Sequence, residues 1–220
     1  MLGLESQDQA SLALPLPWQE SLWQSFISRL DQNRLPHAMM LTGSPGIGVE
    51  RIATALAQRL LCTAELSKYA CGTCKGCQLM LAGNHPDLSI LEPAESGKAI
   101  LIDQVRELLG KLSKTAQQGG WKVALISPAE AMNISASNAL LKSLEEPQGQ
   151  TLLLLLSYRP SLVSATIRSR CQVFELSLLG ADELSDHVRW IIEDAMTFVK
   201  REVKRGNQYE AIMLDPPAFG

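Results

Sequence analysis

Two groups of chemically active residue types stand out in this chain of 220 amino acids, and the first is a cluster of cysteines. Its pattern is Cys62-x8-Cys71-x2-Cys74-x2-Cys77. The two C-x2-C steps bring three thiolates to one centre, and Cys62 can supply a fourth ligand. Four sulfur ligands complete a tetrahedron and leave no position for water, so the pattern predicts a structural zinc site. An iron–sulfur cluster or free thiols are the alternatives, although the spacing fits neither common ferredoxin pattern.

The second group is a glycine-rich loop with the spacing of a phosphate-binding loop. Such a loop reads G-x-x-x-x-G-K-[ST], in which the lysine neutralises the phosphates and the hydroxyl holds Mg²⁺. Here Gly43, Gly46 and Gly48 are present, but Val49 and Glu50 replace the lysine and the hydroxyl residue. At an effective dielectric of ~20, a misplaced charge about 4 Å from a phosphate costs roughly 4 kcal/mol. The loop is therefore expected to bind no ATP.

A second catalytic element is also altered. The apolar run Val123–Ile126 is followed by Ser127-Pro128-Ala129-Glu130. In an active ATPase of this kind the strand ends in acids that support Mg²⁺ and polarise the attacking water. Glu130 is displaced by two residues, and we expect it to be a solvated loop acid or a helix-start acid. With both elements altered, the chain is expected to have no intrinsic ATPase activity.

An active ATPase is the rival hypothesis. It requires another lysine, such as Lys98 or Lys142, to replace the missing one at the phosphates. Hydrolysis by the purified chain alone would distinguish the two hypotheses.

Composition restricts the class of protein. The chain is 46% hydrophobic with a net charge of −3, which supports a packed core and does not indicate autonomous nucleic-acid binding. Five cysteines with C-x2-C steps favour metal ligation in a reducing compartment over a disulfide framework. Met1–Pro17 does not resemble a signal peptide, and no apolar run is long enough to cross a bilayer. The chain is therefore expected to be cytoplasmic, without a membrane partner.

Apolar strands and amphipathic helices alternate along the chain, which predicts an α/β fold with a parallel sheet flanked by helices. The glycine-rich loop that begins at Gly43 lies between a predicted strand and a predicted helix, which is the context that a phosphate-binding loop requires. Asp103 is expected to cap the third helix. The predicted strands are 38–41, 88–91, 122–126 and 151–157, and the predicted helices are 18–30, 51–62, 103–112 and 136–145.

Arg170 lies in the triplet Ser169-Arg170-Cys171, after the leucine-rich strand. Its spacing alone leaves two interpretations open. It is either an ordinary surface charge or an arginine finger, whose planar guanidinium stabilises charge on a transferring phosphate.

Three motifs together resemble bacterial clamp-loader subunits of the AAA+ family. They are the run Asn138–Pro147, the Ser169-Arg170-Cys171 triplet and the four-cysteine module, within a likeness that covers about residues 15–178. The altered loop is similar to that of the family member that neither binds nor hydrolyses ATP and acts as a rigid stator. The resemblance implies a P-loop-like clamp-loader domain over residues 1–178, with an inserted zinc-binding module at residues 62–77.

The resemblance also implies roles and partners. Arg170 would be the arginine finger, reaching the ATP site of a neighbouring gamma or tau subunit, and the zinc ligands would be the four cysteines at 62, 71, 74 and 77. The expected partners are the gamma/tau and delta subunits of the DNA polymerase III clamp loader. The sliding clamp and primed DNA would be indirect partners in DNA replication. The chain would thus be a component of a DNA-directed DNA polymerase holoenzyme, with no ATPase activity of its own expected.

Residues 179–220 depart from that family. They are expected to form either a truncated lid or a foreign segment of strand 188–192, helix 194–205 and strand 209–214. The terminal Asp215-Pro-Pro-Ala-Phe-Gly220 resembles motif IV of class I methyltransferases that use S-adenosylmethionine, especially those that methylate ribosomal RNA. A methyltransferase fragment fused to a clamp-loader domain is thus a further alternative. The simplest interpretation is a helix whose basic residues are solvated, namely Lys200, Arg201, Lys204 and Arg205.

Overall fold

The computed structural model describes residues 12–177, apart from residues 65–66, 96, 119 and 147. The chain divides after Leu178, and everything described below belongs to the first of the two units. The interpretations of residues 179–220 as a lid or a methyltransferase-like segment lie outside the described residues and stay predictions.

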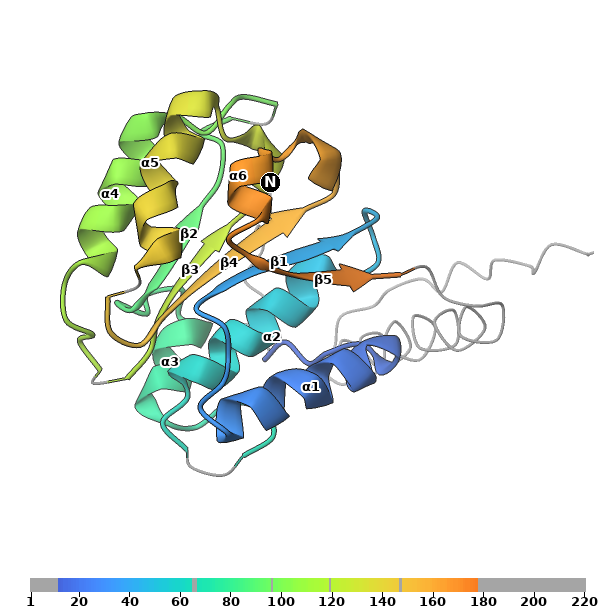
Figure 1. The fold of residues 1–220 in the computed structure, drawn as a ribbon. Helices are drawn as coiled ribbons and strands as arrows, with labels where there is room; N and C mark the ends of the chain where they lie inside the picture. Colours follow the sequence, from blue (N-terminus) through green and yellow to red (C-terminus); the bar gives the residue numbers. More distant parts are fainter. Residues whose placement is uncertain (1–11, 65–66, 96, 119, 147, 178–220) are drawn as a thin grey trace, which may run out of the picture. The chain divides into compact units, whose positions relative to one another are not determined.

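The described residues form strands that alternate with helices (Figure 1). The strands are β1 (Ala38–Gly43), β2 (Leu88–Leu91), β3 (Lys122–Ile126), β4 (Thr151–Ser157) and β5 (Gln172–Leu176). The α-helices are α1 (Glu20–Asp31), α2 (Val49–Leu61), α3 (Lys75–Leu81), α4 (Ile102–Leu112), α5 (Ile134–Glu145) and α6 (Ala165–Arg168). Short 3-10 helices are η1 (Pro17–Gln19), η2 (Ala129–Ala131) and η3 (Pro160–Leu162).

The five strands form one parallel sheet in the order β2-β3-β4-β1-β5. Its centre is β4, in which every residue is buried, as the run of leucines predicts. The register pairs Leu153 with Ala38 of β1 and with Ala124 of β3. Because all strands are parallel, their carboxyl ends meet at one edge, where α/β proteins bind ligands. The predicted parallel α/β sheet is confirmed.

Two apolar cores lie on opposite faces of this sheet, since successive strand residues point to opposite sides. Met39 and Leu41 belong to the core beneath α1 and α2. Ala38 and Met40 belong to the core beneath α4 and α5. Figure 1 shows α4 and α5 on one side of the sheet and α1, α2 and α3 on the other. Both faces are therefore covered, as a parallel sheet requires.

Some local predictions were wrong or incomplete. Asp103 does not cap α4: the N-cap is Leu101, whose backbone N–H donates to the Gln104 side chain at 2.9 Å. Helix α5 begins before the predicted residue 136, because the Asn133 side chain accepts the N–H of Ala136 at 2.8 Å. The elements α3, α6 and β5 have no counterpart in the sequence-based assignment.

Candidate functional site

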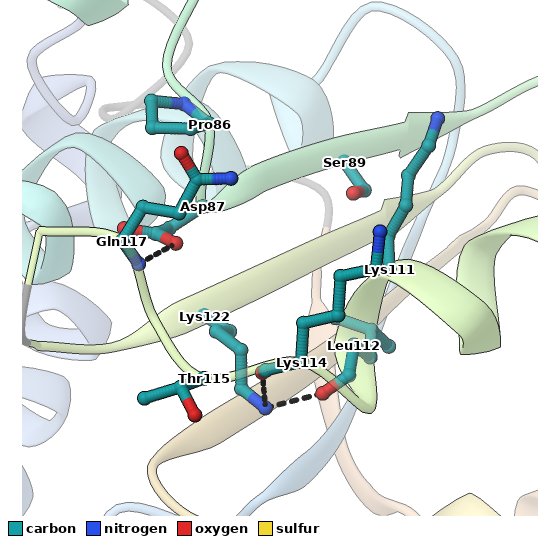
Figure 2. Close-up of a pocket in the computed structure, with 9 residues that line it drawn as sticks. All are labelled: Pro86, Asp87, Ser89, Lys111, Leu112, Lys114, Thr115, Gln117 and Lys122. Carbon is teal, nitrogen blue, oxygen red and sulfur yellow. Dashed lines mark hydrogen bonds between the residues drawn. The ribbon is translucent and has the colours of Figure 1, made fainter.

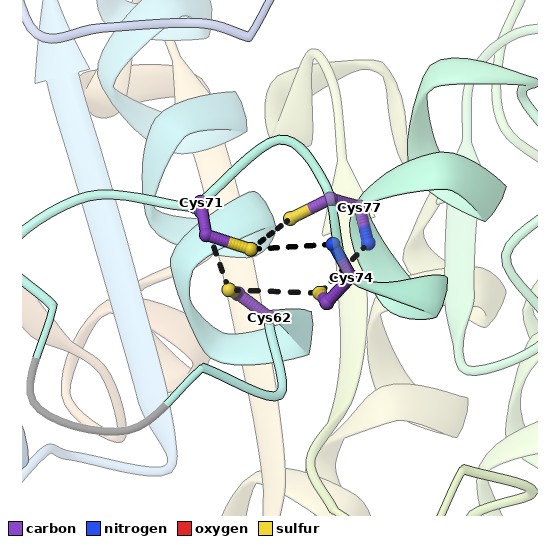
Figure 3. A group of neighbouring side chains, drawn as sticks. All are labelled: Cys62, Cys71, Cys74 and Cys77. Carbon is purple, nitrogen blue, oxygen red and sulfur yellow. Dashed lines mark hydrogen bonds between the residues drawn. The ribbon is translucent and has the colours of Figure 1, made fainter.

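The four cysteines of the module lie together at the ends of two helices (Figure 3). Cys62 follows α2, and Cys74 is the N-cap of α3, which contains Cys77. All four sulfur atoms lie within 4.8 Å of one another. The Sγ atoms of Cys71 and Cys77 are 3.9 Å apart, and those of Cys74 and Cys62 are 3.8 Å apart. The predicted ligand set is therefore assembled and could hold a metal ion.

The distances of 3.9 and 3.8 Å between these two pairs of sulfur atoms match the edges of a tetrahedral site. A tetrahedron with metal–sulfur bonds of about 2.3 Å has sulfur–sulfur edges of about 3.8 Å. Backbone N–H groups also point at the sulfur atoms. Cys62 Sγ accepts from Ala64 and Cys71 at 3.4 Å each, Cys71 Sγ accepts from Cys74 at 3.3 Å, and Cys74 Sγ accepts from Cys77 at 3.4 Å. Such donors stabilise thiolates, the form that binds metals.

The pKa values of Cys74 and Cys77 differ widely when no metal ion is bound. Burial opposes ionisation of Cys74, but hydrogen bonds from Thr63 and Cys77 lower the pKa of Cys74 to about 5. Burial raises the pKa of Cys77 to about 12. Four neighbouring thiolates would repel one another, so a cation is needed for all four to ionise at neutral pH.

Gly76 allows the two halves of the cluster to meet. It lies in α3 between two of the ligands, and a Cβ at this position would overlap the carbonyl oxygen of Leu61. Because Leu61 directly precedes Cys62, this close approach of α3 to the end of α2 brings Cys77 and Cys74 towards Cys62. Gly76 is thus a helical glycine that permits close packing.

The glycine loop has the expected context, between β1 and α2. Gly46 and Gly48 have φ angles of 87° and 88°, in the left-handed region that glycine adopts without strain. The side chain of Leu16 lies where a Cβ of residue 48 would be. The buried Gln19 donates from Nε2 to the carbonyl oxygens of Ile47 and Gly48, at 3.2 and 2.8 Å. Side chains from the segment before α1 therefore fasten the loop.

Glu50 is bound within its own chain rather than directed at a ligand. Its carboxylate accepts a hydrogen bond from the Tyr158 hydroxyl, and Tyr158 directly follows β4. This contact joins the start of α2 to the carboxyl edge of the central strand. An acid thus occupies the position of the Mg²⁺-binding hydroxyl of an active loop.

Glu130 is a helix-start acid, one of its two expected roles, and it is bound by backbone groups rather than by solvent alone. It lies in η2, and its Oε1 accepts the backbone N–H groups of Tyr158 and Arg159 at 3.1 Å each. The carboxylate therefore fixes the turn that follows β4. Ser127 and Pro128 follow β3, so no acid stands directly after that strand.

The two lysines of the rival hypothesis lie elsewhere. Lys98 is exposed in the connection between β2 and α4. Lys142 lines a cavity together with Thr151, the first residue of β4. Since Thr151 is at the amino end of its strand and the glycine loop follows the carboxyl end of β1, Lys142 lies at the opposite edge of the sheet.

Arg170 lies between α6 and β5, with its side chain 33% exposed. Its Nε donates to Glu145 Oε1 at 2.5 Å, and its Nη1 donates to the Thr166 carbonyl oxygen at 3.0 Å. The nearby Arg168 donates from Nη1 to the Pro160 carbonyl oxygen at 2.8 Å. Of these two arginines, Arg170 forms an ion pair with an acid, whereas Arg168 binds the backbone of η3.

A cavity of about 210 Å³ at the amino edge of the sheet contains several polar side chains (Figure 2). Lys122 is buried, and its ammonium donates to the carbonyl oxygens of Leu112 and Lys114 at the end of α4. Asp87 accepts the backbone N–H groups of Gln117 and Gln118 at 2.7 and 2.9 Å. Lys122 and Asp87 therefore bind backbone groups of their own chain, and their charges are not available to a ligand.

Solved structures share the fold of the described residues. Two variants of RuvB from Thermotoga maritima align with TM-scores of 0.51 and 0.50, each at 16% sequence identity. The alignments cover 86% and 83% of this chain and 52% and 51% of the RuvB chains. The parallel sheet, with its glycine loop after β1, is therefore an AAA+-like α/β fold.

The sequence comparisons define the family. Residues 18–179 match the family described as "DNA polymerase III, delta subunit", and the chain belongs to this family. DNA polymerase III subunit delta' of Pseudomonas aeruginosa is 51% identical over 165 residues, which are 75% of this chain and 49% of that protein. The subunit delta' of Escherichia coli is 37% identical over 161 residues, which are 73% of this chain and 48% of that protein.

A related subunit of the same polymerase also matches. DNA polymerase III subunit tau/gamma of Haemophilus influenzae is 33% identical over 174 residues, covering 79% of this chain and 25% of that protein. The chain spans about half the length of the delta' relatives that it matches. In the part of the chain that the structure describes, no helix has both the length and the apolar character needed to cross a bilayer.

Proposed function

We propose that this chain is a non-catalytic stator subunit of the DNA polymerase III clamp loader, which supports sliding-clamp loading in DNA replication. The observation that carries the proposal is the 51% identity to a subunit named delta', combined with valine and glutamate at positions 49 and 50. Its partners are then the gamma/tau and delta subunits, and indirectly the sliding clamp and primed DNA.

The altered loop is unsuited to binding a nucleotide. No lysine follows Gly48, and Glu50 brings a negative charge to the end of the loop where phosphates would bind. Tyr158 ties that carboxylate to the sheet. We therefore propose that the subunit binds no ATP and that its chemical contribution is made to a neighbour.

That contribution comes from Arg170. Its guanidinium is partly exposed and lies on the surface between α6 and β5. A guanidinium supplied in trans stabilises charge on the transferring phosphoryl group and is worth about 10³–10⁵ in rate. Arg170 would act in this way on ATP bound to a gamma or tau subunit.

Zinc is proposed as the metal of the cysteine cluster, with a structural role. Thiolates are soft ligands that suit Zn²⁺ in a tetrahedral arrangement. When bound, the metal would join the end of α2 to α3 and hold the intervening loop.

The proposal is tested by ATP hydrolysis in a complex reconstituted from this chain with gamma/tau and delta subunits. Replacement Arg170→Ala should lower the kcat of the complex by at least about tenfold, since a finger supplied in trans is worth about 10³–10⁵ in rate at the site that it serves. Arg168→Ala is the matched control, because Arg168 is bound to the Pro160 carbonyl oxygen of its own chain. If wild type and Arg170→Ala assemble equally well and have equal kcat values, the proposal that Arg170 is an arginine finger is refuted.

A further inference from the structure

The guanidinium of Arg170 is held by two acceptors from its own chain. Nε donates to Glu145 at 2.5 Å, and Nη1 donates to the Thr166 carbonyl oxygen at 3.0 Å. Glu145 is the last residue of α5, whereas Thr166 belongs to α6, and these two helices are in contact. The two acceptors thus come from separate elements, so together they restrict both the position and the rotation of the guanidinium plane.

The location of Glu145 is unfavourable for the helix that carries it. The carboxyl end of a helix has a partial negative charge, so an acid in the last turn is repelled by the helix dipole. The ion pair with Arg170 opposes this repulsion, but both side chains are partly exposed, at 33% and 49%. Exposed ion pairs contribute little to stability because water and salt screen them. Stability alone therefore gives little reason for an acid at this position.

The contacts leave much of the guanidinium available. Of its five N–H donors, one on Nε and one on Nη1 are engaged, which leaves three, including both on Nη2. Among the residues that the structure describes, Nη2 has no hydrogen-bond acceptor. The free donors can therefore bind phosphate oxygens without first breaking the contact to Glu145.

We propose that Glu145 is a positioning residue for the arginine finger: with the Thr166 carbonyl group, it fixes the orientation in which Arg170 meets the nucleotide of the neighbouring subunit. The inference rests on the proposed function of Arg170. A flexible arginine samples many rotamers, and holding it in one reduces the entropy lost when the transition state forms. Glu145 itself touches no substrate.

The test is ATP hydrolysis by the reconstituted complex with gamma/tau and delta subunits, comparing Glu145→Ala, Glu145→Gln, Arg170→Ala and the double variant Glu145→Ala/Arg170→Ala. Glu146→Gln is the matched control, since Glu146 is the next residue and makes no ion pair with any described residue. Assembly is measured by size-exclusion chromatography and folding by thermal denaturation. If Glu145→Ala fails to fold, Glu145→Gln, which keeps an oxygen acceptor, decides the test.

We expect Glu145→Ala to lower the kcat of the finger-dependent hydrolysis by about tenfold, with the KM for ATP changed by less than about twofold. Glu145→Gln should have a smaller effect in the same direction, and Glu146→Gln none. The double variant should match Arg170→Ala, because both residues act through one guanidinium.

The outcomes separate the two proposals. If Arg170→Ala is as active as wild type, the finger itself is refuted, and the positioning role falls with it. If Arg170→Ala is impaired while both Glu145 variants reach or exceed the wild-type kcat, the finger stands and the positioning role is refuted. A double variant slower than Arg170→Ala would also contradict the positioning role, because Glu145 would then act independently.

Discussion

At the residue scale, the cysteine cluster and the glycine loop could be predicted because their identities and spacing specify local chemistry. The pattern of C-x2-C steps predicts one centre, and the four sulfur atoms do lie within 4.8 Å of one another. Contacts between residues distant in the sequence left no such signal. Tyr158 binds Glu50 across 108 positions, and Glu145 binds Arg170 across 25. The first pair depends on the completed sheet, which brings the start of α2 to the end of β4, and the second depends on the packing of α5 against α6.

Replacement Gly76→Ala should weaken metal binding, because the added methyl group would overlap the Leu61 carbonyl oxygen and push α3 away from Cys62. Zinc affinity, measured by competition with a chromophoric chelator, should fall by at least about tenfold. Gly110→Ala is the matched control: it lies on the exposed face of α4 with no atom within 4 Å of its Cβ position. It should keep wild-type affinity and raise the free energy of unfolding by about 1 kcal/mol. Equal affinity for both variants would contradict the packing role of Gly76.

The five cysteines should react with an alkylating reagent in a defined order. Metal should protect Cys62, Cys71, Cys74 and Cys77, and a chelator should expose these four, because removal of the metal frees their thiols. Cys171 should stay unmodified until denaturant is added, since burial raises the pKa of its thiol to about 12. Mass spectrometry after each step counts the adducts. Full modification of the four cysteines before chelation would argue against a bound metal.

At the element scale, the long periodic helices and the fully buried strands were predicted well, since their patterns come from the apolar faces that they bury. Short elements were missed. Helix α6 has four residues and α3 has seven, too few for a helical repeat to emerge. Strand β5 lies at the edge of the sheet and is mostly exposed, so it lacks the continuous apolar run of β4. Its identity as a strand comes from pairing with β1.

The start of α5 gives a prediction at this scale. Replacement Asn133→Ala removes the oxygen that accepts the N–H of Ala136, so the free energy of unfolding should fall by about 1 kcal/mol in urea denaturation. Asn133→Ser keeps a capping oxygen, so it should lower the free energy of unfolding by only a few tenths of about 1 kcal/mol. Equal destabilisation by serine and alanine would show that the side chain does not cap the helix.

At the scale of the whole molecule, an AAA+-like fold is combined with a loop that lacks the lysine and the hydroxyl residue of a phosphate-binding loop. The sheet still brings the glycine loop and the strand ends to one edge, as in a nucleotide-binding protein. Leu16 and Gln19 pack against the loop, and Tyr158 binds the acid at its end. The family to which the chain belongs was predictable from motifs at residues 138–147 and 169–171, because the combination of these motifs is specific.

The central claim is that this chain holds no nucleotide of its own. Equilibrium binding of Mg-ATP to the purified chain tests it most directly, by isothermal titration calorimetry beside an ATPase subunit of the clamp loader. A micromolar site weakened by about 4 kcal/mol becomes a roughly millimolar one. We therefore predict no saturable binding below about 1 mM. A dissociation constant in the micromolar range would contradict the claim.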